Sequence, residues 1–389
     1  MAPSARQTST RAGRYVRQPA DYDAFIPTPL PPTPPLRITP EIQARLEAAS
    51  HALGRLDGAV LTLPNPDLFV AMYVRKEAVL SSQIEGTQSS LEDVLAAEAK
   101  IYSPDRPKDV EEVFNYVSAM NYGLSRLETL PVSVRLFREI HARLLKGVRG
   151  SDRTPGELRR SQNWIGPGGC TLNEAVFVPP PPDLVPLALS DLERFLHSPQ
   201  NLPLLIKVGL AHAQFETIHP FLDGNGRVGR LLITFLLVAG GALHKPVLYL
   251  SHYFKRHRSE YYERLQAIRD AGQWEEWLSF FLAGVAEVSD QAAQTAREIL
   301  RLRETLRERI TMKLGRSAGN GLRALEHLFE RPIVRVRDVR NVLGSTYQVA
   351  NELVRRLREL GIVTEITGRR RNRRFRFDAY VRLFADESN

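Results

Sequence analysis

A nearly continuous series of helical patterns between Pro40 and Leu314 constrains the fold more than any other feature of the chain. Apolar side chains recur there every three or four residues, which is the period of an amphipathic helix. The segments that carry this pattern, or are rich in good helix formers, are 40–54, 68–84, 90–101, 108–127, 132–147, 183–196, 202–218, 226–239, 251–270 and 274–313. Such a chain is expected to fold as a mainly α-helical domain.

Residues 155–182 interrupt the helical pattern. They contain a Gly-Pro-Gly-Gly turn that is followed by the β-prone residues Ala175, Val176, Phe177 and Val178. Turn residues beside a β-prone run are typical of a hairpin. We therefore expect a small β-hairpin in this segment, which we call the flap.

The N-terminal residues 1–36 have a different composition from the helical part. They are basic at first and then proline-rich, ending in "IPTPLPPTPPL". A segment of this kind favours an extended or polyproline conformation and cannot form a core of its own. We expect it to be an arm that either straps the following domain or forms a disordered tail.

The chain after residue 314 has another design. We expect a linker at 315–321, a helix at 321–330, a second helix in "RDVRNVLG" and a third from Ser345 to Leu360. Two β-like runs, "IVTEIT" and "RFRFD", then flank the turn "GRRRNR". Three helices followed by a basic hairpin are typical of a winged helix-turn-helix. Residues 315–389 are therefore predicted to form a separate α+β domain.

The winged-helix pattern suggests DNA as a partner of residues 316–389. Polar side chains on the outward face of the third helix could read a groove: Thr346, Gln348, Asn351 and Arg355. Arginines of the hairpin could grip a phosphate backbone: Arg369, Arg370, Arg371, Arg373, Arg374 and Arg376. Winged helices also serve in dimerisation and protein docking, so the sequence leaves DNA contact and a homodimer open.

Charge, cysteine content and hydropathy limit the class of protein. The formal net charge of +9 is compatible with an acidic partner. Cys170 is the single cysteine, so no intrachain disulfide can form. The longest apolar run, 231–243, is too short to cross a membrane, and the N-terminus lacks the apolar stretch of a secretory signal. We expect a cytoplasmic protein without a membrane partner.

The stretch "HPFLDGNGRVGR" at 219–230 carries three glycines in the register of a dinucleotide-binding turn. That turn requires a strand before the glycines and an acidic residue about 20 positions later. Here a helical pattern precedes the glycines, and no Asp or Glu stands between Asp223 and Glu260. A dinucleotide fold is therefore disfavoured. The nine histidines show no H-x-H or H-E-x-x-H spacing, which also disfavours a metal hydrolase.

The same stretch fits a loop that leads into the N-terminus of a helix. Gly224, Asn225 and Gly226 can aim backbone N–H groups at an anion. Arg227 and Arg230 follow in the first helical turn and can bind phosphate oxygens. Two further residues complete the pattern, because a carboxylate at Asp223 suits Mg²⁺ and His219 can accept a proton at neutral pH. Together these residues predict a site that binds a nucleoside polyphosphate and deprotonates an attacking group.

This stretch resembles the signature of the Fic family, H-P-F-x-[D/E]-G-N-G-R-x-x-R, and every specified position is filled. The resemblance implies a helical enzyme that moves AMP from ATP to a Ser, Thr or Tyr hydroxyl of a target protein. It implies that His219 is the base, that Asp223 holds Mg²⁺, and that Arg230 grips the γ-phosphate. Gly224, Asn225, Gly226 and Arg227 are implied to hold the phosphates.

Two further parts of the family pattern have counterparts here. The resemblance implies that the flap docks the target through strand addition along Ala175, Val176, Phe177 and Val178. The segment "SEYYERL" resembles the family helix that borders the adenine. Tyr261 and Tyr262 are therefore candidate contacts of the base, although paired tyrosines on a helix are more often core residues.

An upstream stretch, "SSQIEG" at 81–86, resembles the inhibitory helix of the family, [S/T]-x-x-x-E-[G/N]. Ser81 and Glu85 are one helical turn apart, and Gly86 is a natural helix stop. The resemblance implies that Glu85 pairs with Arg230 and so prevents productive binding of ATP. This organisation divides the chain into an arm at 1–36, a helical region with the inhibitory helix at 37–130, a catalytic core at 131–314 and a winged helix at 315–389.

Two alternatives to a self-inhibited protein adenylyltransferase stay open. The chain could be a DNA-binding regulator that senses nucleotide and transfers AMP only slowly or to itself. It could also remove AMP or transfer another phosphoryl-linked group. Phosphate-transferring relatives have a lysine at the position of Gly226, so the sequence favours AMP.

Overall fold

The computed structural model describes residues 11–63, 66–101, 107, 109–199, 201–369 and 371–384. The helices are α1 (Pro40–Leu61), α2 (Pro66–Ile84), α3 (Leu91–Glu98), α4 (Val110–Arg126), α5 (Val134–Leu144), α6 (Val185–His197), α7 (Leu204–Ile218), α8 (Asn225–Ala239), α9 (Ser251–Arg256), α10 (Arg258–Ala271), α11 (Trp274–Leu314), α12 (Ala318–Glu330), α13 (Val336–Leu343), α14 (Tyr347–Glu359) and α15 (Asp378–Arg382). Short strands are β1 (Gly13–Arg17), β2 (Asp23–Pro27), β3 (Ile333–Val334), β4 (Thr364–Glu365) and β5 (Phe375–Arg376). The predicted fold class, mainly α with small β-hairpins, is confirmed.

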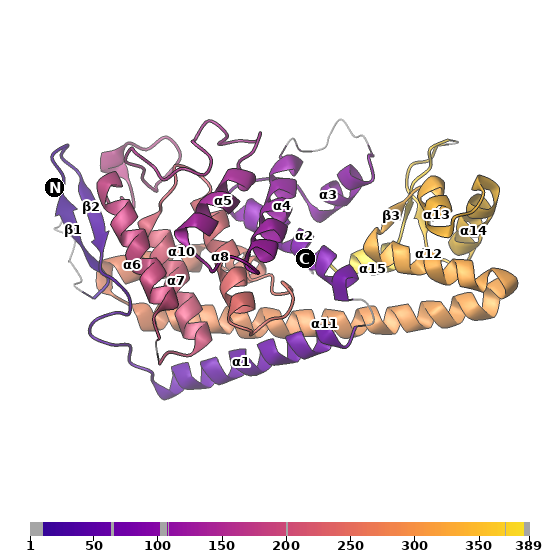
Figure 1. Ribbon diagram of the computed structural model, residues 1–389, viewed down its shortest axis with the longest axis horizontal. Helices are drawn as coiled ribbons and strands as arrows, with labels where there is room; N and C mark the ends of the chain where they lie inside the picture. Colours follow the sequence, from indigo (N-terminus) through magenta and orange to yellow (C-terminus); the bar gives the residue numbers. More distant parts are fainter. Residues whose placement is uncertain are drawn as a thin grey trace.

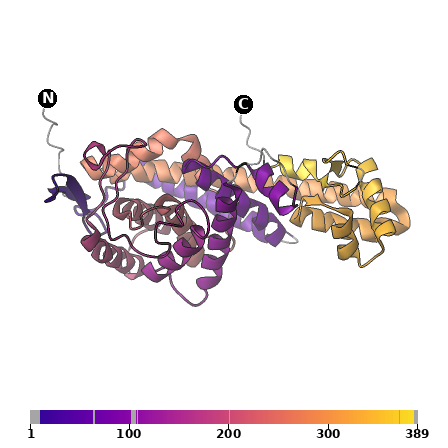
Figure 2. The ribbon, with the colours of Figure 1, turned by 90° about the horizontal axis from the view of Figure 1, so that it is seen from above.

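Helix α11 forms the long axis of the molecule (Figure 1). Its first half packs along α1. Thr39 is the N-cap of α1, Pro40 is its first residue, and the helix extends to Leu61 rather than ending near residue 54. The second half of α11 leads to the C-terminal helices. Figures 1 and 2 show these helices at one end of the molecule and the N-terminal strands at the other.

Helices α7 and α8 form the centre of the core. Every residue of α7 from Leu205 to Ile218 is buried except Lys207, and α8 is buried from Arg227 to Leu237. A helix that is apolar on all sides must be surrounded by other elements. The close packing of α4 against α8 depends on Gly123, because a Cβ at this position would lie 2.2 Å from the ring of Phe235.

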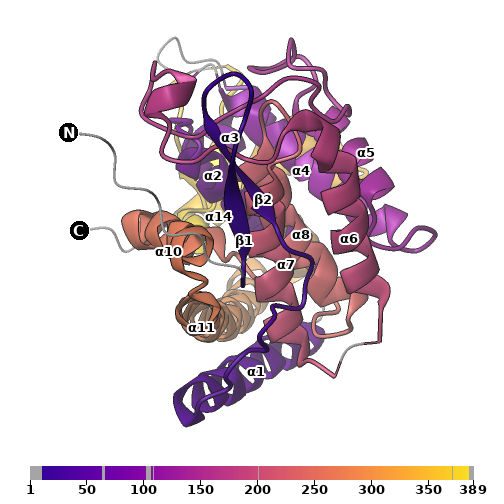
Figure 3. The ribbon, with the colours of Figure 1, turned by 90° about the vertical axis from the view of Figure 1, so that its left-hand side faces the viewer.

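The N-terminal arm contains a β-hairpin that the sequence analysis did not predict. Strands β1 and β2 pair antiparallel, with Tyr15 opposite Phe25, and the hairpin lies in front of α7 in Figure 3. Phe25 is fully buried, and its N–H donates to the carbonyl oxygen of Val178 at 2.9 Å. Arg11 forms an ion pair with Glu275 at 2.6 Å. The described part of the arm is therefore a strap and not a free tail.

The flap is less regular than predicted. Its hairpin is reduced to one isolated bridge between Ile165 and Phe177, and the connecting loop contains a 3₁₀ turn at Leu172–Glu174. The cause lies in the composition, since Pro167 and the four prolines at 179–182 have no N–H to donate to a strand.

The chain after α11 forms the predicted helices and strands, and it also contains strand β3 and helix α15, which were not predicted. Residues 315–321 are not an extended linker, because Gly315–Ser317 forms a 3₁₀ turn and α12 begins at Ala318. Helices α12, α13 and α14 pack together, and β3, β5 and β4 form a small antiparallel sheet in that order. We call residues 318–384 the C-terminal domain, and residues 364–376, which comprise β4, β5 and their turn, the wing.

The segment 251–270, predicted as one helix, is two helices that meet at His257. Within the described residues, no helix is long and apolar enough to cross a membrane.

Candidate active site

His219 ends α7 in a left-handed backbone conformation, with φ 49° and ψ 59°. Its carbonyl oxygen accepts hydrogen bonds from the Arg159 guanidinium at 2.9 Å and from the Asn163 amide at 3.4 Å. Burial, with the nearby charges of Arg159 and Arg269, lowers the pKa of His219 to about 3. The imidazole is therefore neutral near pH 7, the state in which a ring nitrogen can accept a proton, and the same burial makes it a weaker base than an exposed histidine.

The loop from Pro220 to Gly224 is held rigidly. Phe221 is fully buried and stacks on His141, with ring centroids 3.8 Å apart. The Asn225 side chain accepts from the Phe221 N–H and donates to the Phe221 carbonyl, both at 2.8 Å. The side chain of Asn225 thus fixes the loop, and only its backbone N–H remains as a candidate for anion binding.

His141 is a second support of this loop that sequence reasoning missed. Its Nδ1 accepts a hydrogen bond from the Gly156 N–H at 2.8 Å, so its Nε2 carries the proton and donates to the Asp223 carbonyl at 3.0 Å. Burial lowers the pKa of His141 to about 4, which keeps it neutral. No local pattern marks His141, because its role depends on tertiary contacts.

Asp223 is the acidic residue of the loop, and its side chain is 37% exposed. Its Oδ1 accepts from the Gly224 N–H at 2.6 Å. Its Oδ2 lies against Gly150, where a Cβ would be 2.5 Å away. The carboxylate is an accessible oxygen ligand beside the N-terminus of α8, which fits a Mg²⁺ that takes its other ligands from phosphate and water. Within the described residues, no group of three or more His, Cys, Asp or Glu side chains could hold a metal.

Arg227 lies in the first turn of α8 and is fully buried. Its Nη1 donates to the Glu112 carboxylate at 3.0 Å, and Arg149 donates to the same oxygen at 3.4 Å. The Nε and Nη2 atoms of Arg227 are buried and have no hydrogen-bond partner in the described part of the chain, and Nη2 forms a longer ion pair with Asp223 Oδ1 at 3.6 Å. Unsatisfied buried donors next to a helix N-terminus are suited to an anionic ligand.

Arg230 is buried and held by the end of α2. Its Nε donates to Ser81 Oγ at 2.8 Å, and its Nη2 donates to the Ser81 carbonyl at 2.9 Å and to Glu85 Oε1 at 2.6 Å. Burial opposes ionisation of Glu85, but the charge and hydrogen bond of Arg230 outweigh it and lower the pKa of Glu85. The ion pair joins residues that are 145 positions apart.

The Glu85 carboxylate also lies against the N-terminal turn of α8. A Cβ on Gly226 would be 2.2 Å from Glu85 Oε1 and 3.0 Å from Arg230 Nη1. The N–H groups of this turn have no acceptor within the helix. Glu85 therefore occupies the space beside the predicted phosphate-binding residues. Gly86, with φ +95°, follows the end of α2.

Two buried carboxyl groups near Arg230 were also missed. Glu77 accepts hydrogen bonds from Ser251 Oγ at 2.5 Å and from Tyr116 at 3.2 Å. Glu216 Oε1 is buried without a partner in the described residues and lies against Gly229. Burial raises the pKa of both carboxyl groups to about 7. In the sequence, Glu216 could have been singled out because it is an acidic residue within the apolar pattern of α7.

Comparison with known proteins decides the family of this site. Residues 131–237, which include the whole 219–230 stretch, match the model of the Fic/DOC family, and residues 43–125 match that of the Fic/DOC family N-terminal region. Residues 43–125 and 131–237 thus belong to the Fic/DOC family.

Curated relatives of this Fic protein include the protein adenylyltransferase Fic of Drosophila grimshawi, 32% identical over 183 residues, which are 46% of this chain and 33% of the relative. A probable protein adenylyltransferase of Aquifex aeolicus is 33% identical over 181 residues, 45% of this chain and 51% of the relative. The match therefore spans about a third to a half of the length of these relatives.

Solved structures share the fold of this Fic protein. A Fic family protein from Desulfovibrio desulfuricans has a TM-score of 0.59 at 22% identity and covers 88% of this chain and 97% of its own. A Fic domain containing signaling protein from Bacteroides thetaiotaomicron has a TM-score of 0.51 at 18% identity, covering 66% of this chain and 97% of its own.

The two candidate adenine contacts of this Fic protein have different surroundings. Tyr261 is buried, its hydroxyl forms a hydrogen bond with His212 Nε2 at 2.9 Å, and its ring stacks on Phe254. Tyr262 is 40% exposed. Tyr261 thus packs in the aromatic core, and Tyr262 is the more accessible of the two.

The four flap residues also differ in exposure. Val176 is half-exposed, Ala175 is partly buried, and Phe177 and Val178 are buried. Because the Val178 carbonyl already accepts from the Phe25 N–H, the arm occupies that edge of the flap. Target docking by strand addition stays a prediction for the remaining backbone of the flap.

The predicted DNA-binding residues lie apart from this site, in the C-terminal domain. Gln348 and Arg371 are exposed, and Thr346 caps α14 through a bond from the Val349 N–H at 3.3 Å. Arg355 is exposed but forms ion pairs with Glu352 and Glu359. Arg373 donates to Asn351 at 2.9 Å. Arg370 lies outside the described residues.

Proposed function

We propose that this Fic protein is a protein adenylyltransferase that transfers AMP from ATP to a Ser, Thr or Tyr hydroxyl of a target protein or of itself. The observation that carries the proposal is a neutral His219 at the end of α7, which the loop 220–224 joins to the N-terminal turn of α8, where the buried Arg227 has donors without a hydrogen-bond partner in the described residues. A proton acceptor beside an anion-binding helix N-terminus suits phosphoryl-type transfer.

The reaction is a displacement at the α-phosphorus of ATP. His219 accepts the proton of the target hydroxyl, the oxygen bonds to the α-phosphorus, and pyrophosphate leaves. The backbone N–H groups of Gly226 and Arg227 and the guanidinium of Arg227 hold the phosphates in place. Asp223 would hold Mg²⁺, which would offset phosphate charge. Phe221, Asn225 and His141 keep the loop in position for this step.

The resting protein is proposed to be inhibited by Glu85. Its carboxylate takes a donor of Arg230 and occupies the space against Gly226, so it competes with a terminal phosphate for both. Two anions cannot share this space without strong repulsion. ATP that enters beside Glu85 is then not held in line with the attacking hydroxyl.

Mass spectrometry of the intact chain after exposure to MgATP, with and without a cell extract as a source of targets, tests the reaction class. We expect a mass gain equal to AMP on a hydroxyl-bearing residue. A gain equal to phosphate would instead support phosphate transfer. Loss of AMP from a modified protein without any gain would support the reverse reaction.

Binding of duplex DNA by the C-terminal domain is a second candidate function. The exposed side chains Tyr347, Gln348 and Val349 form a combined polar and apolar face at the start of α14, and Arg371 lies in the wing. Apolar groups beside an amide donor suit base edges in a major groove. A DNA-binding regulator that uses nucleotide only as a signal would bind DNA but leave no AMP on protein.

Electrophoretic retardation of duplex DNA by the full chain at several salt concentrations tests this candidate. We expect Arg371→Ala to weaken binding to all sequences and to reduce the salt slope by about 1. Gln348→Ala is expected to relax sequence preference with the slope unchanged. Retardation that is absent at low salt would exclude DNA as the partner.

A further inference from the structure

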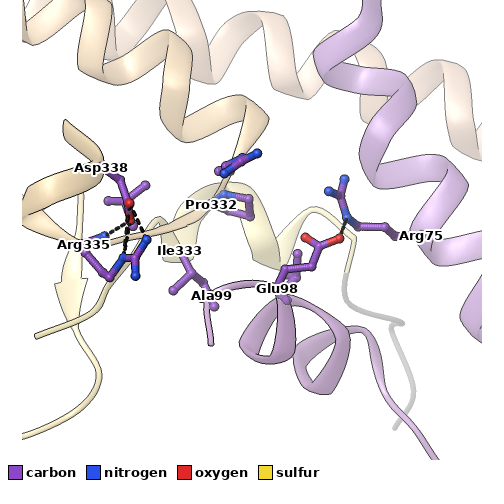
Figure 4. A pocket seen from close by; sticks show the side chains of 10 residues that line it. Arg75, Glu98, Ala99, Pro332, Ile333, Arg335 and Asp338 are labelled. Atoms are coloured by element: carbon purple, nitrogen blue, oxygen red, sulfur yellow. Dashed lines mark hydrogen bonds and ion pairs between the residues drawn. The ribbon is translucent and has the colours of Figure 1, made fainter. Parts of the chain in front are cut away.

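The C-terminal domain packs against the two helices that flank Glu85. The ring of Phe384 contacts Tyr73 of α2 edge to face at 5.2 Å, and α12 also contacts α2. Figure 4 shows the seam between α3 and this domain, where Pro332 and Ile333 lie opposite Ala99 and the Arg75–Glu98 ion pair. The inhibitory helix is therefore enclosed by the catalytic core on one side and by the C-terminal domain on the other.

Arginines of the wing hold this seam together. Arg374 is 9% exposed, and it donates to the carbonyl oxygens of Ala99 at 2.9 Å and Lys100 at 3.4 Å, just after the end of α3. Arg376 donates to Glu92 at 3.4 Å. A cation at the end of a helix binds carbonyls that lack an intrahelical donor and is favoured by the helix dipole. The wing is thus fixed to both ends of α3.

The position of α3 is coupled to that of Glu85 through a short and tied loop. Glu85 follows the last residue of α2, and Ser90 already caps α3. Two hydrogen bonds tie this loop to the last turn of α2. The Gln83 amide donates to the Ser89 carbonyl at 2.9 Å, and the Thr87 N–H donates to the Ser82 carbonyl at 3.2 Å. A shift of α3 therefore pulls directly on the segment that places Glu85 on Arg230.

The arginines that hold α3 belong to the same wing that is the candidate phosphate contact for DNA. Arg374 is 9% exposed and all three of its guanidinium nitrogens donate to carbonyl oxygens, those of Ala99, Asn372 and Lys100, so a DNA phosphate can reach it only when it leaves α3. Resting on the function proposed above, we propose that the docked wing holds Glu85 on Arg230, and that duplex DNA competes with α3 for the wing and so releases the inhibition. DNA binding and inhibition by Glu85 are then reciprocally coupled.

Initial rates of AMP transfer by seam variants of the full chain test the coupling without any DNA. We expect Arg374→Ala to raise the rate about tenfold, which corresponds to ~1.4 kcal/mol. Glu92→Arg repels Arg376 from the other side of the seam and is expected to raise the rate a few-fold. The control is Arg316→Ala, which removes an exposed arginine from the turn before α12 and should leave the rate unchanged.

Two further comparisons separate the coupling from loss of structure and from failure of the proposed reaction. In a Glu85→Gly background neither seam variant should add to the rate, since the inhibitory group is already absent. Glu92 is exposed, so Glu92→Arg remains informative if Arg374→Ala unfolds the domain. If both variants leave the rate of the otherwise native chain unchanged while Glu85→Gly raises it, the coupling is refuted. If Glu85→Gly also transfers no AMP, the proposed reaction itself fails.

DNA is then tested as the competing partner. A duplex of about 20 base pairs, two turns of the helix, is expected at low salt to raise transfer by the native chain towards the level of Arg374→Ala. It should leave the rate of Glu85→Gly unchanged. A duplex that binds the chain and does not change the native rate would overturn DNA as the releasing partner.

Discussion

Replacement of Glu85 by glycine is expected to raise the rate of AMP transfer about 10- to 100-fold, the effect of removing one charge-assisted hydrogen bond worth ~1.5–3 kcal/mol. In the native chain the Glu85 carboxylate binds Arg230 Nη2 at 2.6 Å and lies against Gly226. Glycine frees both the guanidinium and the space beside the helix N-terminus. The measurement is the initial rate of label transfer from α-labelled ATP in the presence of Mg²⁺.

Two variants make this measurement specific. Glu85→Gln keeps the shape and one acceptor but removes the charge, so its rate should lie between those of the native chain and Glu85→Gly. Glu263→Gln removes the charge of an exposed acid on α10 and should have no effect. Because Glu85 lies beyond the last residue of α2, glycine at this position should not unfold the helix. An unchanged rate in Glu85→Gly would remove Glu85 as the inhibitor.

The sequence predicted those parts of the site that are local. The 219–230 stretch contains His219, the glycine-containing loop 224–226 and both arginines in one segment, and its spacing alone indicates a loop that leads into a helix N-terminus. The pairing of Glu85 with Arg230 is different, since the residues are 145 positions apart. No periodicity brings them together, and only the resemblance to the Fic family suggested their contact.

The residues that were missed act through tertiary contacts. His141 supports the loop from α5, Arg159 holds the His219 carbonyl from a loop, and Glu112 holds Arg227 from α4. In the sequence each of them resembles an ordinary surface residue. Its supporting role follows from its position in the folded chain. The same reason applies to the hairpin of the N-terminal arm, whose short strands are stabilised by Phe25 packing into the core. Short strands of this kind carry too little pattern to be predicted.

The contacts of the wing could not be predicted either. An arginine-rich turn is read from sequence as a solvated surface or a DNA contact, yet Arg374 is largely buried against α3. The wing therefore has an intramolecular partner as well as a candidate external one. The contact of Arg374 with the Ala99 carbonyl joins residues that are 275 positions apart, so no local pattern could reveal it.

Replacement of His219 by alanine is expected to abolish AMP transfer in both the native and the Glu85→Gly backgrounds. General-base catalysis contributes about 10²- to 10⁴-fold, and the neutral His219 imidazole is the proton acceptor in the proposed mechanism. The Glu85→Gly background is used because its higher rate of AMP transfer makes a large decrease measurable. The readout is AMP transferred per chain, determined by mass spectrometry over a time course.

The control for this variant separates chemistry from binding. ATP affinity of the Glu85→Gly, His219→Ala chain, measured by calorimetry, should equal that of Glu85→Gly, because Arg227, Arg230 and the first turn of α8 remain in place. His51→Ala, which removes an exposed histidine of α1, should change neither affinity nor rate. If the Glu85→Gly, His219→Ala chain retained AMP transfer at the Glu85→Gly rate, another group would have to accept the proton of the target hydroxyl. Glu216, one turn earlier on α7, would then be the first residue to replace, because its buried Oε1 has no hydrogen-bond partner in the described residues.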